Sequence, residues 1–407
     1  MRHLLVQRHF GPYFLTQFLG ALNDNFYKTA MLLAIVYRLQ AGDPQQAAIL
    51  SQLAAAVFIL PFFLFSLWAG GLADRYDKAM LIRRIKAAEI IIMLIGGLGL
   101  MYGHIGLLFA ALFGMGTHSA FFGPVKYAII PQHVDQAHLT QATGLVEAGT
   151  FLAILSGQLW AGLMVPAHSI AVMIAVAVAG YGAALFIPAA TAATQEGAAS
   201  ASALTSWRLA WHFLARAEMR RPILRISYFW ALGLLLTTQL APLVVDMLRA
   251  PQMLVSFYLA LFSIGIACGA LLAMRLSRAY SPETLVRAAA VLIALMLLLL
   301  YAMLSALHPL SDTAGLSQTQ GRVLLGLILF MLATVAGVYI VPLYVFLQKL
   351  PEPHQRARLL AINNISNSAI MVLSSLLAAA AQISGADSAQ IILGSSFLWT
   401  FCYWFLK

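Results

Sequence analysis

The stretch Gly70-Gly71-Leu72-Ala73-Asp74-Arg75-Tyr76-Asp77-Lys78 is a short charged turn between two long apolar segments. Its glycines allow neighbouring helices to approach closely. An aspartate near a helix end can hold adjoining segments through its charge and its hydrogen bonds. We therefore expect Gly70, Asp74 and Arg75 to form a releasable conformational lock, although a short turn with ordinary solvated charges is the simpler alternative.

The composition around this turn is that of a membrane protein. Only 9% of the 407 residues are charged, against about 25% in soluble domains, and the mean hydropathy is +0.87. A helix needs about 20 apolar residues to cross a bilayer. By this measure the sequence predicts an all-α membrane protein with twelve spans, at residues 11–38, 47–72, 79–102, 105–130, 137–164, 168–189, 223–248, 252–277, 283–306, 321–348, 357–382 and 389–406.

The basic residues predict how the chain is oriented. Nineteen of the 24 lysines and arginines fall at the termini or in the loops that share their side, and three lie on the other side. Cytoplasmic loops carry such an excess, so we expect both termini in the cytoplasm. The net charge of +10 is then a topology signal, and we expect no nucleic-acid partner.

The spans divide into two halves. We expect six-helix bundles at 1–189 and 223–407, joined by a cytoplasmic linker at 190–222. Trp207, Trp211 and Leu214 share one face of a helix in this linker, which suits either a membrane-surface helix or a plain helical connection. With a two-residue insertion, the prolines of span 4 align with those of span 10, and Glu147 then aligns with Asn367. Repeated halves of this kind are typical of secondary transporters.

Three full charges, Asp24, Lys126 and Glu147, stand inside predicted spans. A charge at mid-membrane depth costs at least about 2.5–3.5 kcal/mol, so it usually faces a partner or a wet cavity. Two acids and one base together suit a ligand that carries both charges, although internal salt bridges between helices are the alternative for each. The expected binding residues are Asn23, Asp24, Asn25, Lys28, Lys126, Tyr127, Glu147, Asn364 and Asn367.

Other buried polar residues have simpler interpretations. Glu89 lies three residues after Lys86, which favours a structural ion pair. His118 fits a core histidine better than a proton relay. Lys28 lies four residues after Asp24 and could simply pair with it.

The turn at 70–78 resembles the signature loop of the major facilitator superfamily, which runs Gly-x-Leu-x-Asp-Arg-aromatic-Gly-Arg-basic. Asp77 replaces the usual second glycine. The segments 16–25, 121–131, 144–150 and 341–343 resemble the bacterial lysophospholipid transporter family, and most closely its versions fused to acyltransferase and acyl-carrier-protein synthetase domains. Stand-alone members carry an arginine shortly after a Phe-Trp pair in span 7, whereas no cation follows Phe229-Trp230 here.

The resemblance implies a transporter of the bacterial inner membrane. It would flip lysophospholipids, chiefly lysophosphatidylethanolamine, from the outer to the cytoplasmic leaflet for re-acylation. The resemblance also implies alternating access, membrane lipids as surroundings and functional coupling to an acyltransferase or acyl-carrier-protein synthetase. We expect a monomer without cofactor or metal. The residues suit this substrate, because Lys126 offers a charge for phosphate while Asp24 and Glu147 offer acceptors for ammonium.

Two other functions compete with this one. A proton-coupled exporter of amphipathic molecules would use Asp24 or Glu147 as the protonating acid. An acyltransferase would need a His-x4-Asp motif, but His308 and Asp312 are separated by only three residues. We therefore expect no enzyme activity from these 407 residues.

Overall fold

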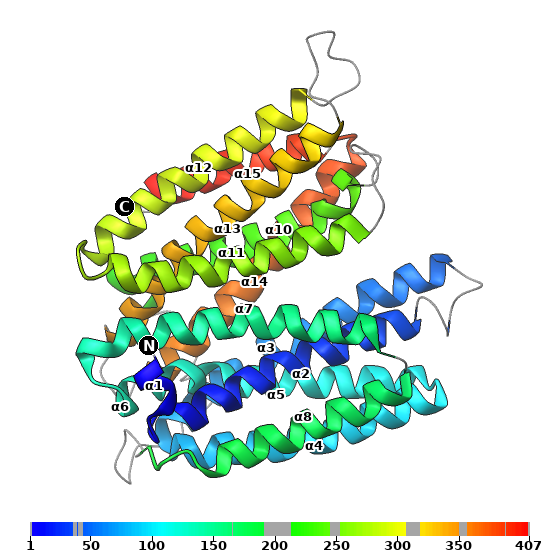
Figure 1. Ribbon diagram of the computed structural model, residues 1–407, viewed down its shortest axis with the longest axis vertical. Helices are drawn as coiled ribbons and strands as arrows, with labels where there is room; N and C mark the ends of the chain where they lie inside the picture. The colour runs from blue at the N-terminus through cyan, green and yellow to red at the C-terminus, as the bar shows by residue number, and fades with distance from the viewer. Residues whose placement is uncertain are drawn as a thin grey trace. The chain divides into compact units, whose positions relative to one another are not determined.

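The computed structural model describes residues 2–35, 39, 44–164, 166–190, 213–244, 253–306, 318–349, 356–386 and 388–405. Helices account for nearly all of this part of the chain (Figure 1). In order they are α1 (Arg2–Val6), α2 (Gly11–Ala34), α3 (Pro44–Arg75), α4 (Lys78–Tyr102), α5 (Ile105–Ala128), α6 (Ile130–His133), the 3₁₀ turn η2 (Gln136–His138), α7 (Leu139–Leu163), α8 (Pro166–Leu185), α10 (Ala217–Pro242), α11 (Met253–Leu276), α12 (Pro282–Ala306), α13 (Gln318–Lys349), α14 (Arg356–Ile383) and α15 (Ser388–Phe405).

Each predicted span has a long helix at its place, and the predicted all-helical membrane fold is confirmed. Ten helices of the described part are both long enough and apolar enough to cross a membrane. The long helices α2 and α15 are not among these ten. α2 carries Asn23, Asp24, Asn25 and Lys28, whose polarity lowers its hydropathy. α2 therefore owes its lower hydropathy to four of the nine predicted binding residues.

The chain divides into two compact units. The first comprises Met1–Arg216 with Leu347–Ile365, and the second comprises Ala217–Phe346 with Ser366–Lys407. The end of α13 and the first third of α14 therefore belong to the first unit. The predicted halves at 1–189 and 223–407 stay a prediction. The predicted linker helix around Trp207 and the His308–Asp312 segment lie almost entirely outside the described residues.

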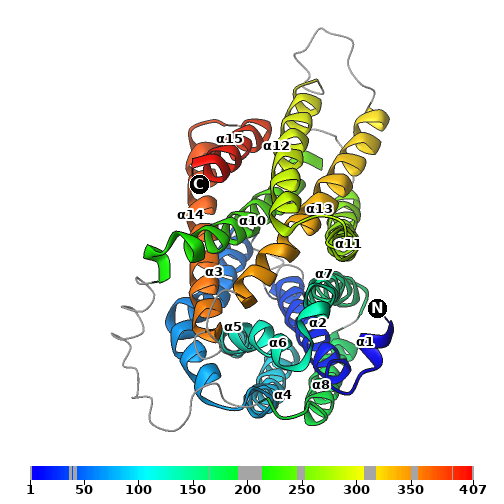
Figure 2. The same ribbon diagram turned by 90° about the vertical axis from the view of Figure 1, so that its left-hand side faces the viewer.

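In the first unit α2 packs against α7 and α8, α5 packs against α3 and α4, and α4 also packs against α8 (Figure 2). A side chain at Gly157 of α7 would overlap the backbone of α2 at Leu22, so this glycine sets how closely the two helices approach. One end of the bundle is an apolar core that includes Phe26, Tyr27 and Met115. The polar residues of α2 lie beside this core, on the same helix.

In the second unit α12 packs against α15, and α10 contacts α11 and α15. Gly265 and Gly269 of α11 allow close packing against α13. A Cβ at Gly269 would overlap the backbone oxygen of Thr334 in α13, and a Cβ at Gly265 would lie 2.7 Å from that of Ala333. Two membrane helices can approach this closely only where side chains are small.

Candidate substrate site and conformational lock

Asp74, at the end of α3, caps the start of α14. Its Oδ1 accepts a hydrogen bond from the backbone N–H of Ala357 at 3.0 Å, and its Oδ2 accepts one from Arg358 at 3.2 Å. The Arg358 Nε lies 3.8 Å from Oδ2. The first N–H groups of a helix have no partner inside the helix, and the positive end of the helix dipole attracts a carboxylate. Asp74 is thus a carboxyl cap for a helix that begins 282 residues further along the chain.

The other signature residues have separate roles. Gly70 allows α3 to approach α14, because a Cβ there would lie 2.7 Å from the Ala361 Cβ and 3.0 Å from the Arg358 Cα. Arg75 is exposed, and its guanidinium lies 5.6 Å from the ring centroid of Tyr76. Of the three predicted lock residues, Gly70 and Asp74 contact the start of α14.

Asp77 explains the departure from the usual loop sequence. Its Oδ1 accepts a hydrogen bond from Met80 N at 2.7 Å, which caps α4, and its Oδ2 accepts one from Ala190 N at 2.8 Å. Where the family pattern has glycine, this chain has a helix cap that also holds the segment after α8.

A first group of buried polar side chains joins α2, α4 and α5. We call it the Asp24 cluster, and its members are Asn23, Asp24, Lys86, Glu89, His118 and Ser119. Glu89 is at its centre. It forms an ion pair with Lys86, accepts a hydrogen bond from Asn23 Nδ2 at 2.8 Å, and lies 3.0 Å from His118 Nε2. Lys86 and Glu89 are fully buried, so their predicted ion pair is confirmed.

Asp24 itself is the most accessible carboxylate of this cluster. Its side chain is 16% exposed, whereas that of Glu89 is 0% exposed. Ser119 Oγ donates to Asp24 Oδ2 at 2.6 Å, and His118 Nδ1 lies 4.0 Å from Oδ1. His118 therefore stands between the two carboxylates. It is a buried histidine with a carboxylate partner, as a core histidine would be.

A second group joins α2, α5 and α7. We call it the Glu147 cluster, and its members are Tyr13, Gln17, Lys126, Tyr127, Glu147 and Thr150. Tyr127 donates its hydroxyl proton to Glu147 Oε1. Lys126 Nζ donates to Thr150 Oγ1 at 2.8 Å, and Thr150 donates to Gln17 Oε1 at 3.1 Å. Glu147 Oε2 is buried and accepts no hydrogen bond from the residues that the structure describes. This leaves one carboxylate oxygen for a ligand.

The two clusters are offset along the same pair of helices. Gln17 and Asp24 are seven residues apart on α2, and Ser119 and Lys126 are seven apart on α5. Seven residues make nearly two turns and about 10 Å of helix. The predicted charges thus lie in one unit and on facing helices, but at two depths rather than at one point.

The remaining predicted residues divide among several places. Asn25 Nδ2 donates to Ala21 O at 2.9 Å within its own helix. Lys28 Nζ lies 5.4 Å from the ring centroid of Phe58. Asn364 lies against Gly123 of α5, where a Cβ would overlap its side-chain amide. One amide of α14 therefore lies beside Gly123, which precedes Lys126 by three positions in α5.

Asn367 falls in the second unit, where its Oδ1 accepts a hydrogen bond from Ser227 Oγ at 2.8 Å. It is a buried side chain with a partner there. Its predicted role at the substrate site stays a prediction.

The comparisons with known proteins place this geometry in a family. The model of the major facilitator superfamily matches residues 13–375. The chain belongs to the major facilitator superfamily. The human organic anion transporter MFSD10 has the same fold, with a TM-score of 0.78 at 15% identity and coverage of 98% of this chain and 99% of that one. The Escherichia coli fucose:proton symporter FucP follows with a TM-score of 0.70 at 14% identity, covering 98% and 97%.

Curated relatives are more similar in sequence. The lysophospholipid transporters LplT of Salmonella typhi and Salmonella newport are each 29% identical over 367 residues, which covers 88% of this chain and 84% of theirs. Both the relatives and the structural neighbours are transporters. The chain is thus a multi-pass membrane protein and a homologue of lysophospholipid transporters, and it is not an enzyme.

Several residues of the Asp24 and Glu147 clusters could not be identified from the sequence. Ser119, Thr150 and Tyr13 are ordinary hydroxyl residues in apolar helices, and nothing marks them in isolation. A search for polar residues seven positions from each charge would have found Gln17 and Ser119. The contact of Asp74 with the N–H groups of Ala357 and Arg358 has no side-chain signal in α14 at all.

Proposed function

We propose that this protein moves lysophospholipids, chiefly those with an ethanolamine headgroup, from the outer to the cytoplasmic leaflet of a bacterial inner membrane. The observation that carries the proposal is the pair of buried clusters on α2 and α5. They offer Lys126 for the phosphate, and Asp24 with the free Glu147 oxygen for the ammonium. The homology to lysophospholipid transporters supports the same substrate class.

The two depths of the charges suit a substrate that moves through the protein. A headgroup can exchange contacts between clusters that lie about 10 Å apart, without one site binding both charges too tightly to release them. We propose alternating access, in which the Asp74 contact with the start of α14 breaks and re-forms. Both termini would lie in the cytoplasm.

The protein would work as a monomer. The delivered lysophospholipid would be re-acylated in the cytoplasmic leaflet. We propose functional coupling to an acyltransferase or acyl-carrier-protein synthetase, as the resemblance to the fused versions implies.

A flipping assay in proteoliposomes tests this proposal. Lysophospholipids with ethanolamine, glycerol and choline headgroups are compared at equal concentration. Lys126→Ala should slow all three, because each carries the phosphate. Removing one partner of a buried charge pair costs about 2 kcal/mol or more, which is about thirtyfold. Asp24→Asn should slow the ethanolamine substrate much more than the glycerol one, which has no ammonium.

The exposed Lys349 provides the control, since Lys349→Ala removes a lysine outside both clusters. It should transport like the wild type. Wild-type rates in well-folded Lys126→Ala protein would remove the phosphate assignment. Equal effects of Asp24→Asn on both headgroups would remove the ammonium assignment.

A proton-coupled exporter is the second candidate, and the position of His118 favours it. This residue lies 3.0 Å from Glu89 and 4.0 Å from Asp24, and it can hold a proton between two buried acids. In this case transport should stop when the pH gradient is collapsed, and His118→Gln should remove the dependence on the gradient. A lysophospholipid flippase without proton coupling continues under both conditions.

A further inference from the structure

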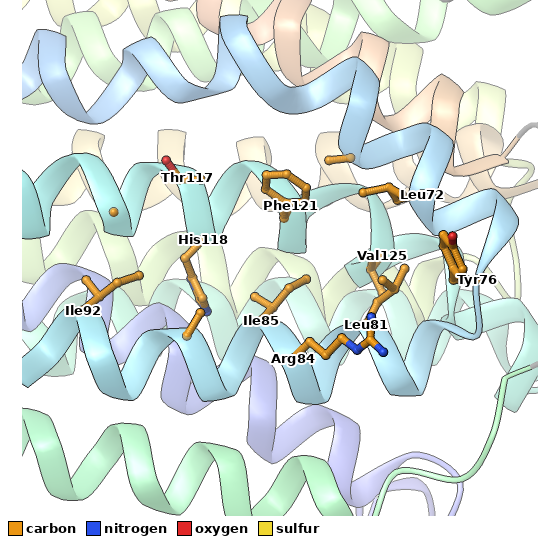
Figure 3. A pocket seen from close by; sticks show the side chains of 13 residues that line it. Leu72, Tyr76, Leu81, Arg84, Ile85, Ile92, Thr117, His118, Phe121 and Val125 are labelled. Carbon is orange, nitrogen blue, oxygen red and sulfur yellow. The ribbon is translucent and has the colours of Figure 1, made fainter. Parts of the chain in front are cut away.

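A cavity of about 530 Å³ lies between α3, α4 and α5, beside the Asp24 cluster, whose His118 forms part of its wall (Figure 3). It opens at the surface of the first unit, where Tyr76, Arg84 and Ala88 are exposed. Its volume is within the usual range of about 300–1,000 Å³ for ligand pockets. Most of the lining residues are apolar, among them Leu72, Ile85, Ile92, Phe121 and Val125.

The charge of the cavity is one-sided. Among the lining residues, Arg84 carries a permanent positive charge, and no aspartate or glutamate is present. The imidazole of His118 forms part of the inner wall and makes its contacts with Glu89 and Asp24 behind that wall. A bound molecule therefore meets one cation, one imidazole and an apolar surface.

The cavity also has the length of one leaflet. Arg84 and Ile92 lie on the same helix, eight residues apart, which is about 12 Å. Half of the hydrocarbon core of about 30 Å is nearly the same length. Arg84 lies six residues from the start of α4, where a headgroup would be, and Ile92 lies close to the middle of this 25-residue helix. Tyr76 stands at the same end as Arg84, where tyrosines favour the membrane interface.

We propose that this cavity binds a net-anionic diacyl phospholipid of the surrounding bilayer, with its phosphate on Arg84 and one acyl chain extending to Ile92. Charge selects this occupant. A zwitterionic headgroup would bring an ammonium to a cavity without a carboxylate, whereas the Asp24 and Glu147 clusters supply acids. The cavity thus recognises another class of lipid than the substrate site, and its occupancy does not depend on the proposed transport.

Trp68 reports on this cavity. It is 61% exposed, and its ring lies 5.3 Å from that of Phe121, a lining residue. A variant that keeps Trp68 and has the other six tryptophans replaced by phenylalanine is reconstituted in phosphatidylcholine vesicles. Brominated phosphatidylglycerol or brominated phosphatidylcholine is then added at equal fractions, and quenching of Trp68 fluorescence is measured.

Phosphatidylglycerol should be favoured about fivefold, the factor that one cation provides at an anionic headgroup. Arg84→Gln should abolish the preference, and Arg84→Lys should retain it. Arg275→Gln, which removes an exposed cation at the end of α11, should leave it unchanged. A protein with Trp160 of α7 as its reporter should show no preference.

Equal quenching by the two lipids at Trp68, or an unchanged preference in Arg84→Gln, would overturn the proposal. So would displacement of the anionic lipid by lysophosphatidylethanolamine at equal concentration, since the cavity would then be part of the substrate path. Native mass spectrometry of the protein with all its tryptophans gives a second measurement. Retained phosphatidylglycerol should decrease in Arg84→Gln and not in Arg275→Gln.

Discussion

The contact between Asp74 and the start of α14 can be tested by removing its carboxylate. Asp74→Ala leaves the N–H groups of Ala357 and Arg358 without their acceptors. Loss of a capping side chain costs about 0.5–2 kcal/mol, and loss of a charge at the dipole adds about 0.3–1 kcal/mol. We expect the start of α14 to open about 1–3 kcal/mol more easily, which is a factor of about 5–150.

Hydrogen–deuterium exchange measures this opening at the affected amides. Peptides that contain Ala357 and Arg358 should exchange about 5–150 times faster in Asp74→Ala than in the wild type. Asp77→Ala is the matched control, because Asp77 lies three residues away and caps a different helix. It should accelerate exchange at Met80 and leave the start of α14 unchanged. Unchanged exchange at Ala357 and Arg358 in Asp74→Ala would refute the assignment of Asp74 as the cap.

Three further predictions concern stability. Glu89→Gln leaves the fully buried Lys86 without its carboxylate and should lower the free energy of unfolding by about 3–5 kcal/mol. The unfolding temperature in detergent should fall accordingly. The double variant with Lys86→Met should recover most of the lost stability. Gly269→Leu forces a side chain into the backbone of α13 and should lower the free energy of unfolding by about 1–3 kcal/mol or more in the same assay. Gly233→Leu is the control and should lower it less, because Gly233 has open space around it. Burial lowers the pKa of His133. Its contribution to stability is therefore complete above the ordinary histidine pKa of about 6.5 and decreases as the pH falls below that value. The unfolding temperature of His133→Gln should therefore depend less on pH between about pH 7.5 and 5.5 than that of the wild type.

The pairing of the expected site residues could not be predicted from the sequence. Tyr127 and Glu147 were both expected in the site, and the structure joins them by a hydrogen bond. The expected alternative for Lys28 was an ion pair with Asp24, yet Lys28 lies over Phe58 and Asp24 bonds Ser119. A charged side chain on one helix can pair with side chains of every neighbouring helix. The spacing of residues along its own helix shows only a few of these possible partners.

α14 shows the same limit at a larger scale. The repeat in the sequence aligns the Asn363–Asn367 segment with the Glu147 segment, but it does not show which compact unit each residue joins. In the structure Asn364 lies against Gly123 in the first unit, while Asn367 bonds Ser227 in the second. The unit boundary falls inside one continuous helix, between Ile365 and Ser366.

The sequence by itself determined the twelve helices, the class of protein and the helices that carry the charges. It could do so because a membrane forces each helix to satisfy its own backbone hydrogen bonds, and the apolar length of each segment is then readable locally. Tertiary structure alone decided that Asp74 caps α14, that His118 stands between two acids, and that Asp24 and Lys126 lie at different depths. These contacts join residues from 29 to 284 positions apart. They depend on how the helices pack, which the pattern of any single segment does not contain.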